Sequence, residues 1–443
     1  MSHKAYPQYH STGIDWLGDV PQHWRLKRFK FAVNRVEKKT EVDEDDTVLY
    51  VGLEHIESWT GTLLPLNPDL VPSGMVNVFV TGNTLFGKLR PYLAKASNVD
   101  FNGVCSTELL VLNGKEINRR LLLYFLLSNG FIKIVDSSTF GTKMPRANWE
   151  FIGSTPLPIP PADEQLQIAD FLDREIGRID LLVGKKRELV ERLKEKRSAL
   201  ISSTVTRGLP PEAARAVGLP EAPPLKPTNI AWMGDIPSHW NPRRLRHISD
   251  TITVGVVVNP SSYFSDEGVP FLLGGDIREF TIDISNCKRC SQESSDGPLR
   301  KSRLDEGDLV VVRVGYPGIA AVVPSELAGA NCASMMLVRR HSRFVSKWLA
   351  YAFNSQMGRD QIEIVQYGAA QKQFNISHAV DFWFAFPPLE EQQAIVEFLD
   401  RETCKLNGLV AKIESAIERL QEYRAALINA AVTGKIDVRK AIA

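Results

Sequence analysis

One long amphipathic stretch occurs twice in this chain, and this duplication constrains the fold more than any other feature. Residues 163–206 and 390–433 carry apolar side chains at alternating spacings of four and three residues, which is the pattern of a coiled-coil seam. Equivalent seam positions differ by 227 in number, as 172 and 399 do. The main seam residues are Leu172, Ile176, Ile179, Val183, Leu193 and Leu200 in the first copy, and Leu399, Leu406, Val410, Ile413, Ile417, Leu420 and Leu427 in the second.

The ends of both stretches carry helix-boundary signals. Prolines stand just before each stretch, at 160–161 and 387–388, and two carboxylates follow in each first turn, where the helix dipole favours them. Gly208 and Gly434 follow the last periodic residues as predicted C-caps. At 1.5 Å per residue, roughly 40 residues make a rod of about 60 Å. The sequence therefore predicts two matching rods.

The repeat extends well beyond these helices. The arm sequence of residues 12–24, with its two tryptophans, recurs at 228–240, an offset of 216 (12 to 228). The offset then grows to 227 by Gly103–Thr107 and Ala330–Ser334, and stays constant through the helix. The two copies therefore differ most in the globular part between arm and helix.

Short apolar runs punctuated by Gly, Pro and Asn predict strands at Val48–Val51, Leu85–Leu89 and Leu109–Leu112, while Leu121–Leu127 and Trp348–Phe353 predict one buried helix per copy. The fold class is α+β: two pseudo-symmetric globular domains joined by two long antiparallel coiled-coil helices, a two-fold dumbbell in one chain. The expected segments are residues 1–160 (arm and first domain), 161–207 (first helix), 208–227 (semi-rigid Pro-rich linker), 228–387 (second arm and domain), 388–435 (second helix) and 436–443 (tail).

Composition excludes several classes of protein. The 443 residues contain no apolar run long enough for a membrane helix and no hydrophobic stretch near Met1, which predicts a cytoplasmic protein. The net charge of +1 argues neither for nor against nucleic acid, so a DNA-binding surface must be local or shared with a partner. Cys105 and Cys332 are equivalent in the repeat and suit core positions, while the lone Cys287–Cys290 pair predicts solvated loop thiols rather than zinc ligands.

Three repeated motifs carry a family resemblance. They are the Trp-Leu/Met-Gly-Asp-Val/Ile-Pro-x-His-Trp arms, the Tyr50-Val-Gly-Leu-Glu-His-Ile56 stretch, and the Pro-x-x-Glu-Gln openings of both helices. Together they resemble the specificity subunit of type I restriction-modification systems, twice, over essentially the whole chain. The second copy departs from the pattern with Gly274-Gly-Asp276 in place of Leu-Glu-His, which weakens a functional role for His55.

The resemblance implies two target recognition domains, each reading one half of a bipartite, asymmetric DNA site, with the helices as a spacer. It also implies that two methyltransferase subunits dock on the helices, where the seam region serves as the partner surface, and that restriction-translocase subunits complete the complex. S-adenosylmethionine, ATP and Mg²⁺ are then expected in the partner subunits, and this chain binds no cofactor itself.

No catalytic motif stands out. The run Gly82-Asn-Thr-Leu-Phe-Gly-Lys88 fits a P-loop, but Leu89 replaces the Ser or Thr that holds magnesium, so a turn followed by a strand is the better interpretation. No methyltransferase or nuclease motif is found. His23 and His239 belong to the repeated arms, where a structural hydrogen bond is the expected role. We therefore expect no catalytic residues and no metal site.

Candidate DNA contacts are polar, basic and aromatic residues at corresponding places in the two globular domains. Arg and Lys suit guanine edges or phosphates, and Gln and Asn suit adenine. The candidates are Lys88, Arg90, Tyr92, Lys143, Arg146 and Asn148 in the first domain, and Arg313, Tyr316, Gln371, Lys372, Gln373 and Asn375 in the second. A plain solvated surface is the alternative. The basic runs Arg25–Lys30 and Arg243–Arg246 either touch phosphates or form a solvated face.

The arginines within the seam, Arg197 and Arg424, either specify register or extend to solvent near the helix ends. Their positions near the ends favour extension to solvent. Taken together, the sequence predicts a non-enzymatic DNA specificity subunit. The alternative is a duplicated coiled-coil adaptor that bridges proteins without recognising DNA.

Overall fold

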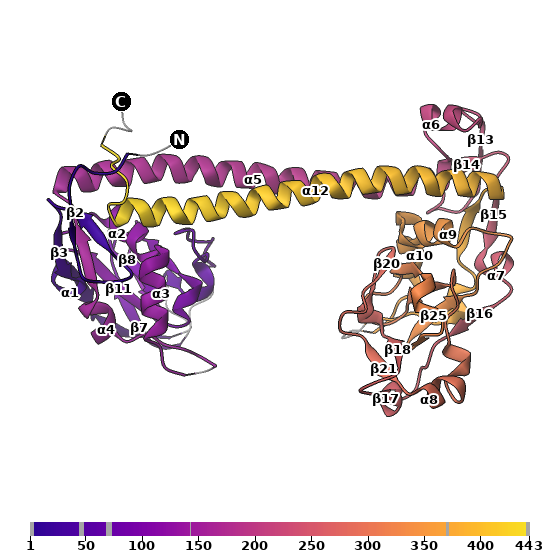
Figure 1. Cartoon of the computed structure of the whole chain (residues 1–443), viewed down its shortest axis with the longest axis horizontal. Coiled ribbons are helices and arrows are strands. Elements are labelled where there is room, and N and C mark those ends of the chain that lie inside the picture. Colours follow the sequence, from indigo (N-terminus) through magenta and orange to yellow (C-terminus); the bar gives the residue numbers. More distant parts are fainter. Residues whose placement is uncertain (1–3, 44–47, 68–72, 142, 369–371, 440–443) are drawn as a thin grey trace. The chain divides into compact units, whose positions relative to one another are not determined.

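The computed structural model describes residues 4–43, 48–67, 73–141, 143–368 and 372–439 (Figure 1). The chain divides into two compact units, the first made of residues 1–187 and 414–443 and the second of residues 188–413. We call the globular parts of these units head one and head two. Each unit thus contains one head and a segment of both long helices, a division that differs from the segments expected from the sequence.

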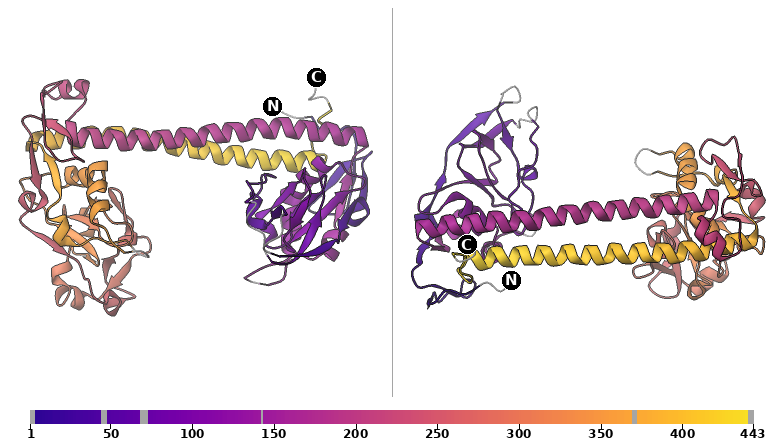
Figure 2. Two further views of the ribbon diagram at one scale, coloured as in Figure 1. Left: turned by 180° about the vertical axis from the view of Figure 1, so that it is seen from behind. Right: turned by 90° about the horizontal axis from the view of Figure 1, so that it is seen from above.

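The two long helices are α5 (Ala162–Arg207) and α12 (Leu389–Val432), within one residue of the periodic stretches 163–206 and 390–433. In unit 1 the beginning of α5 lies beside the end of α12, so the helices are antiparallel there (Figures 1 and 2). In unit 2 the end of α5 packs against the beginning of α12 in the same sense. Gly208 and Gly434 adopt φ of 87° and 71°, as the predicted C-caps require.

Every predicted seam position is buried or half-buried, which confirms the seam. The most enclosed are Leu172, Ile176 and Leu399, next to the heads, while Leu193, Val410 and Leu420 are half-buried. Apolar packing is therefore densest where the helices also cover a head.

Head one is built on two four-stranded sheets. The first has the order β5-β7-β10-β6, in which β6 and β10 are parallel, and the second has the order β4-β11-β8-β9. The strands are β4 (Val33–Val36), β5 (Lys39–Val42), β6 (Tyr50–Val51), β7 (Gly74–Phe79), β8 (Thr84–Gly87), β9 (Ala96–Asn98), β10 (Gly103–Cys105) and β11 (Leu109–Gly114). The helices are α1 (Phe29–Ala32), α2 (Arg119–Leu126), α3 (Asn129–Ser137) and α4 (Trp149–Ser154). The predicted strand Leu109–Leu112 and the predicted helix are confirmed, while the predicted strands Val48–Val51 and Leu85–Leu89 are confirmed only in part, as the shorter β6 and β8.

Head two repeats this plan. Its sheets β16-β25-β22-β23 and β17-β21-β18-β24 again include one parallel pair, β18 with β24. The strands are β16 (Ile252–Val254), β17 (Phe264–Ser265), β18 (Val269–Leu272), β21 (Lys288–Cys290), β22 (Leu309–Val312), β23 (Ala320–Val322), β24 (Asn331–Cys332) and β25 (Met335–Val338), with the separate ribbon of β19 (Ile277–Arg278) and β20 (Thr281–Ile282). The helices are α7 (Leu245–Ile248), α8 (Gln292–Asp296), α9 (Ser346–Asn354), α10 (Gln356–Val365) and α11 (Ile376–Ala379).

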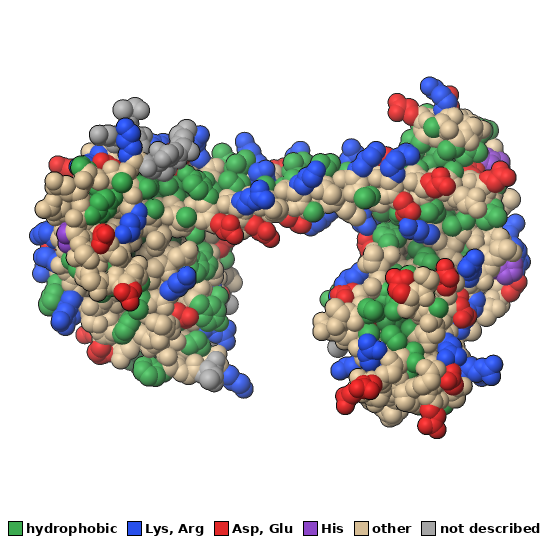
Figure 3. All heavy atoms as spheres, viewed as in Figure 1, with side chains coloured by type: hydrophobic (Ala, Val, Ile, Leu, Met, Phe, Trp, Pro, Cys, Tyr) green, Lys and Arg blue, Asp and Glu red, His purple; other side chains and the backbone are tan. Residues whose placement is uncertain are grey.

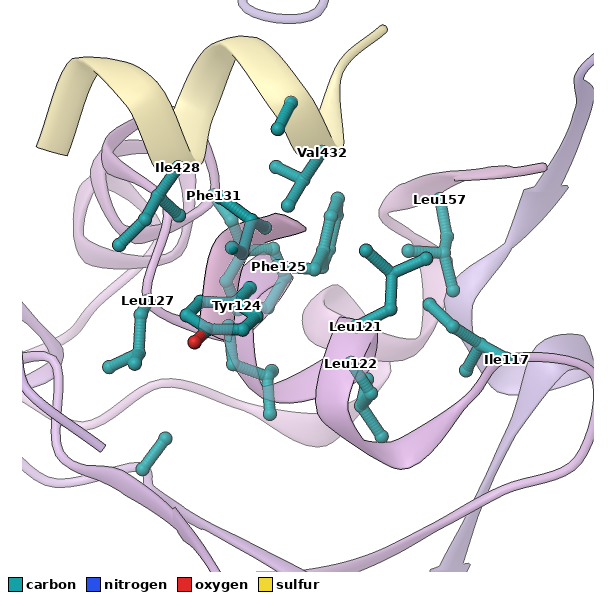
Figure 4. Close-up of a cluster of buried hydrophobic side chains, with 14 of the residues drawn as sticks. Ile117, Leu121, Leu122, Tyr124, Phe125, Leu127, Phe131, Leu157, Ile428 and Val432 are labelled. Atoms are coloured by element: carbon teal, nitrogen blue, oxygen red, sulfur yellow. The ribbon is translucent and has the colours of Figure 1, made fainter. Parts of the chain in front are cut away.

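The core of each unit combines a head with both long helices. In unit 1, Ile428 and Val432 of α12 point toward Phe125 and Phe131 of head one (Figure 4). In unit 2, Ile201 of α5 and Ile395 of α12 belong to one apolar cluster with the buried aromatic residues of head two. Each head therefore uses one helix that follows it directly and one that follows the other head.

The arms explain the repeated Glu-Gln at the helix openings. Glu164 is buried, and its carboxylate accepts hydrogen bonds from the indole N–H of Trp24 (3.1 Å) and the hydroxyl of Tyr6, and bonds His23 Nε2 (2.7 Å). Glu391 bonds His239 and Trp240 in the same way. The structural role expected for these histidines is confirmed. Burial, followed by the bond to Glu164, raises the pKa of Tyr6 well above its ordinary value.

The neighbouring glutamines join the long helices to the heads. Gln165 Oε1 accepts from the backbone N–H of Asn118 at 2.6 Å, and Gln392 Oε1 accepts from that of Val345 at 2.9 Å. Both amide groups also donate to the carbonyl of the proline five residues earlier. Two adjacent polar residues therefore fix an arm and a head to each helix start.

The arms are short hairpins of β1 (Tyr9–Ser11) with β2 (Asp19–Pro21) and of β13 (Leu225–Pro227) with β14 (Asp235–Pro237). Two further ribbons join the arms to the helix starts: β3 (Arg25–Arg28) with β12 (Pro156–Ile159), and β15 (Asn241–Arg244) with β26 (Trp383–Phe386). The predicted linker 208–227 is in fact folded. It contains α6 (Pro211–Ala216) and β13, and buries Leu209 and Ala214 in the core of unit 2.

The predictions for the cysteines are confirmed in part. Cys105 and Cys332 are buried, and burial raises the pKa of each thiol to about 12. The prediction of solvated thiols at 287 and 290 is wrong for Cys290, which lies fully buried at the end of β21. All five cysteines are free.

Candidate nucleic-acid interface

In head one, the candidate residues gather around a short hairpin. Phe140 and Arg146 pair through their backbones, and the carbonyl of Lys88 accepts from the N–H of Ala147 at 2.9 Å. The N–H of Arg90 donates to the carbonyl of Pro145 at 2.7 Å. The end of strand β8 and the segment before α4 therefore form one surface, although they are far apart in the sequence.

The side chains on this surface are mostly exposed. Phe140 is 79% exposed at the hairpin, and Lys143, Tyr92 and Arg90 are also exposed. Arg90 has a left-handed backbone (φ 52°) and donates from Nη2 to the carbonyl of Lys143 at 3.4 Å. Arg146 is paired with Glu108 at 3.1 Å. The surface thus combines cationic donors with a protruding aromatic ring.

A cavity of about 750 Å³ is lined by this hairpin, and a second of about 440 Å³ shares part of its lining. Both are lined by Arg35, Lys88 and Leu110, and the larger also by Lys143 and Arg146. We call this hollow the basic groove; its cationic residues are Arg35, Lys39, Lys88, Lys143 and Arg146. Positive charge around a hollow attracts phosphates.

Sequence reasoning missed Arg35 and Lys39. They lie on β4 and β5, in the mostly polar segment 34–41, where cations look like ordinary exposed strand positions. The Arg35 guanidinium stacks over Trp149, 5.4 Å from the ring centre, and pairs with Glu37. Their place beside the candidate residues follows from the order of strands in the sheets, which the local sequence does not reveal.

Head two has the same hairpin with other side chains. Tyr367 and Gln373 pair through two backbone hydrogen bonds of 2.9 Å, and the N–H of Phe374 donates to the carbonyl of Arg313. The N–H of Gly315 donates to the carbonyl of Lys372 at 2.9 Å. Each bond matches one in head one, so the two surfaces are structurally equivalent.

Lys372 and Tyr316 are exposed on this second surface, Tyr316 by 76%. Arg313 is half-buried and donates from Nε to the carbonyl of Phe374 at 3.2 Å. Gln373 is half-buried within the hairpin. Gln371 lies outside the described residues.

Asn148 and Asn375 have a role that the sequence analysis did not identify. Each is the N-cap of a short helix: Asn148 Oδ1 accepts from the N–H of Glu150 at 3.0 Å, and Asn375 Oδ1 from the N–H of Ser377 at 3.2 Å. Asn is among the preferred N-cap residues. The spacing Asn-x-Glu before an apolar run was the missed signal in the first copy.

His55 and Asp276 are equivalent caps as well. His55 Nδ1 accepts from the N–H of Gly52 at 2.9 Å, and Asp276 Oδ2 accepts from that of Leu273 at 2.7 Å. The departure from the family pattern at Gly274–Asp276 therefore replaces one cap with another. The cap gives both residues a structural role.

The basic runs near the arms are largely engaged in ion pairs. Arg25 and Lys27 pair with Glu116, and Arg244 and Arg246 pair with Asp381. These contacts favour the interpretation of a solvated, paired face over phosphate binding. Lys and Arg side chains are interspersed with Asp and Glu over the faces in Figure 3, in keeping with the net charge of +1.

Comparison with known proteins finds several that are similar to this chain. Residues 81–192 match the family described as type I restriction modification DNA specificity domain. The EcoDI specificity subunit of the type I restriction enzyme from Escherichia coli is 28% identical over 170 residues, which are 38% of this chain and 38% of that protein. The EcoBI specificity subunit from the same species is 21% identical over 324 residues, 72% of this chain and 66% of that protein.

This chain is therefore similar to the type I restriction-modification specificity subunits. The chain spans less than two thirds of the length of either of those relatives. Members of the family are the non-catalytic subunits of their systems, and catalysis lies with other subunits. Among the described residues, no group of His, Cys, Asp and Glu is arranged to hold a metal ion, and no helix is long and apolar enough to cross a membrane.

Solved structures of specificity subunits share the fold. A chain solved in a study of complex assembly and conformational transition of the type I R-M system aligns with a TM-score of 0.67 at 19% identity, covering 94% of this chain and 99% of that chain. The HsdS subunit from Thermoanaerobacter tengcongensis aligns with a TM-score of 0.51, also at 19% identity, covering 94% and 98%. The expected α+β fold class is thereby confirmed.

The long helices of this chain expose apolar side chains that the seam does not use. Leu182 on α5 and Leu409 on α12 are equivalent in the repeat and are 43% and 48% exposed; Leu181 and Leu189 are exposed as well. The seam residues contact the other helix instead. Outward residues such as Leu182 are therefore accessible in addition to the seam residues that the sequence analysis named.

Proposed function

We propose that this chain is the DNA sequence-specificity subunit of a type I restriction-modification complex and reads a bipartite, asymmetric site with one half per head. The observation that carries this proposal is the equivalent pair of hairpins. Their backbones match bond for bond, while Arg146 stands where Gln373 stands in the other copy. Two equivalent supports with different side chains suit the reading of two different half-sites.

Within this proposal, cationic and amide side chains have different roles in contacting DNA. Lys88, Arg90, Lys143 and Arg146 contact guanine edges or phosphates through the basic groove of head one. In head two the proposed contacts come from Arg313, Lys372, Gln371 and Gln373. The two glutamines favour adenine. Tyr92, Tyr316, Asn148 and Asn375 complete the proposed set. The segments 1–160, 161–207, 208–227, 228–387, 388–435 and 436–443 remain the proposed functional division.

Methylation and ATP-dependent cleavage reside in partner subunits under this proposal. Two methyltransferase subunits dock on the outward apolar residues of α5 and α12, which include Leu182 and Leu409. Restriction-translocase subunits join them to form the full complex. S-adenosylmethionine, ATP and Mg²⁺ belong to those partners.

The test is genome-wide detection of methylated bases in cells with and without this chain, the other subunits being kept. Loss of methylation at one split motif of two short half-sites is the expected result, and it would identify the target. Unchanged methylation in cells whose methyltransferase is active at other type I sites would contradict the proposal and favour the adaptor. Pull-down of partners from the same cells would then distinguish the adaptor from an inactive chain.

A further inference from the structure

Each head contains one aromatic residue held in an unusual backbone conformation next to the long helices. Trp59 and Phe280, which are equivalent in the repeat, have φ of 68° and 67°, a left-handed conformation that bulky residues rarely adopt. Their N–H groups donate to Ala94 and Ala320 at 3.1 and 3.0 Å. The surrounding structure must hold both loops firmly, because such a conformation is costly on its own.

In unit 1, the seam arginine holds this loop. Arg424 is only 9% exposed. Its Nη1 donates to the carbonyl of Trp59 at 2.8 Å, its Nη2 to that of Thr60 at 3.2 Å, and its Nε to Asp180 Oδ1 at 2.8 Å. The prediction that Arg424 extends to solvent is therefore wrong.

In unit 2, Arg197 contacts the equivalent loop. Its Nη1 donates to Glu279 Oε2 at 3.0 Å, and its guanidinium lies over the ring of Phe280 at 5.5 Å from the centre. Its side chain is 21% exposed. Like Arg424, Arg197 is on the helix that follows the other head.

The carboxylate partner comes from a different place in each copy. Asp180 lies on α5, and its equivalent on α12 is Asn407. Glu279 lies on the loop of head two, and its equivalent in head one is Ser58. Each arginine therefore has one carboxylate partner, which comes from the other long helix in unit 1 and from the loop of the head in unit 2. An arginine–carboxylate pair is present in both copies although its carboxylate comes from different elements. This indicates that the pair itself matters.

We propose that Arg424 and Arg197 are positioning residues that fix the orientation of each head on the helix pair and thereby set the spacing at which the two half-sites are read. This inference rests on the proposed function. The guanidinium has donors in a rigid planar fork, so its several bonds define where the loop lies. Apolar contacts around it, in contrast, are non-directional and tolerate sliding.

The chain itself supplies the test. Asp180→Asn removes the carboxylate beside Arg424, and the double variant Asp180→Asn with Ser58→Glu transplants the arrangement of unit 2 into unit 1. Glu188→Gln, which removes an exposed carboxylate from the same helix, is the matched control. Each full-length variant is assembled with its methyltransferase subunits. Methylation is then measured on duplexes with the natural spacing and with spacings one base pair longer or shorter.

We expect Asp180→Asn to lower the preference for the natural spacing by about threefold to tenfold, because it weakens a partly exposed charged hydrogen bond. The bases that the complex recognises in the two half-sites should stay the same. The double variant should recover the preference, and Glu188→Gln should keep it. Hydrogen exchange at the Trp59 amide should quicken in the single variant alone.

Two results would overturn the inference. One is a uniform loss of methylation at all spacings, which would mean that the pair only stabilises the fold. The other is an unchanged preference together with unchanged exchange at Trp59. If the wild-type complex methylates no split sequence, the proposed function itself fails and the spacing role with it, while hydrogen exchange still decides whether the pair holds the loop.

Discussion

At the residue scale, Lys372 distinguishes the hairpin of head two from that of head one, where Pro145 stands at the same place. Its side chain is exposed, so removing it should leave the fold intact. We expect Lys372→Ala to reduce methylation of the target and, for a phosphate contact, to lower the slope of log binding constant against log salt by about 1. Binding of the assembled complex, measured by fluorescence anisotropy at several salt concentrations, would check this.

The control for this prediction is Lys288→Ala, which removes an exposed lysine from strand β21 of the same head. It should change neither methylation nor the salt dependence. Loss of complex assembly in Lys372→Ala would instead make Lys372 a structural residue.

Asp276 gives a pH dependence with a definite sign. Burial raises the pKa of its carboxyl above the ordinary value of Asp, so the folded state binds the proton more tightly than the unfolded state. The stability that this contributes is present below the unfolded pKa of about 4 and is lost as pH rises through the folded pKa. Asp276→Asn keeps the oxygen that accepts from Leu273 and removes the ionisation.

We therefore expect the Tm of Asp276→Asn to rise relative to wild type as the pH increases from about 4 toward neutrality. Thermal unfolding followed by circular dichroism across this range is the measurement. A difference in Tm that stays constant with pH would refute the link to ionisation. His55→Asn, which alters the equivalent cap in head one, serves as a comparison.

At the scale of single elements, the sequence predicted the long helices best. Their seam has a regular period, and proline and glycine mark both ends, so local chemistry alone determines where α5 and α12 begin and end. Several residues of both hairpins were also named from the sequence as candidate DNA contacts. Arg35 and Lys39 were not, because their contribution to the basic groove depends on the order of strands in the sheet.

The contacts of the seam arginines also could not be predicted from the local sequence. Arg424 and its partner Asp180 are 244 positions apart in the sequence. Nothing local distinguishes a paired arginine from one that extends to solvent, so only the tertiary packing decides the matter. The folded state of residues 208–227 was missed for a similar reason, since Leu209 is buried by groups distant in the sequence.

Leu193 tests the coiled-coil seam. It is half-buried in α5, and an aspartate there would place a charge against apolar side chains. We expect Leu193→Asp to destabilise the helix pair by about 2 kcal/mol, while both heads keep their folds. Limited proteolysis would detect cleavage within the helices of the variant. Lys196→Asp, at an exposed position three residues on, should resist cleavage as wild type does.

At the scale of the whole molecule, the chain carries almost balanced charge. It has 53 basic and 52 acidic side chains, and both kinds are mixed on the face shown in Figure 3, while five cations gather around the basic groove. DNA affinity depends largely on phosphate neutralisation. We therefore expect the chain alone to bind DNA weakly, with Kd of about 1 μM or more at physiological salt.

A titration of labelled duplex with the purified chain, with and without methyltransferase subunits, would measure this difference. Tight, sequence-specific binding by the chain alone would contradict the expectation. A scrambled duplex of the same length separates specific from general affinity.

The division into units also has a consequence for biosynthesis. Unit 2 is one continuous segment, residues 188–413, whereas unit 1 requires residues 414–443 to complete its core. Although head one is translated first, Ile428 and Val432 reach it only after the rest of the chain has left the ribosome. At about 5–20 residues per second, the nascent head waits roughly 10–50 s with its apolar surface uncovered. The second unit is thus the first able to finish folding, and head one completes its core only when the last turns of α12 arrive.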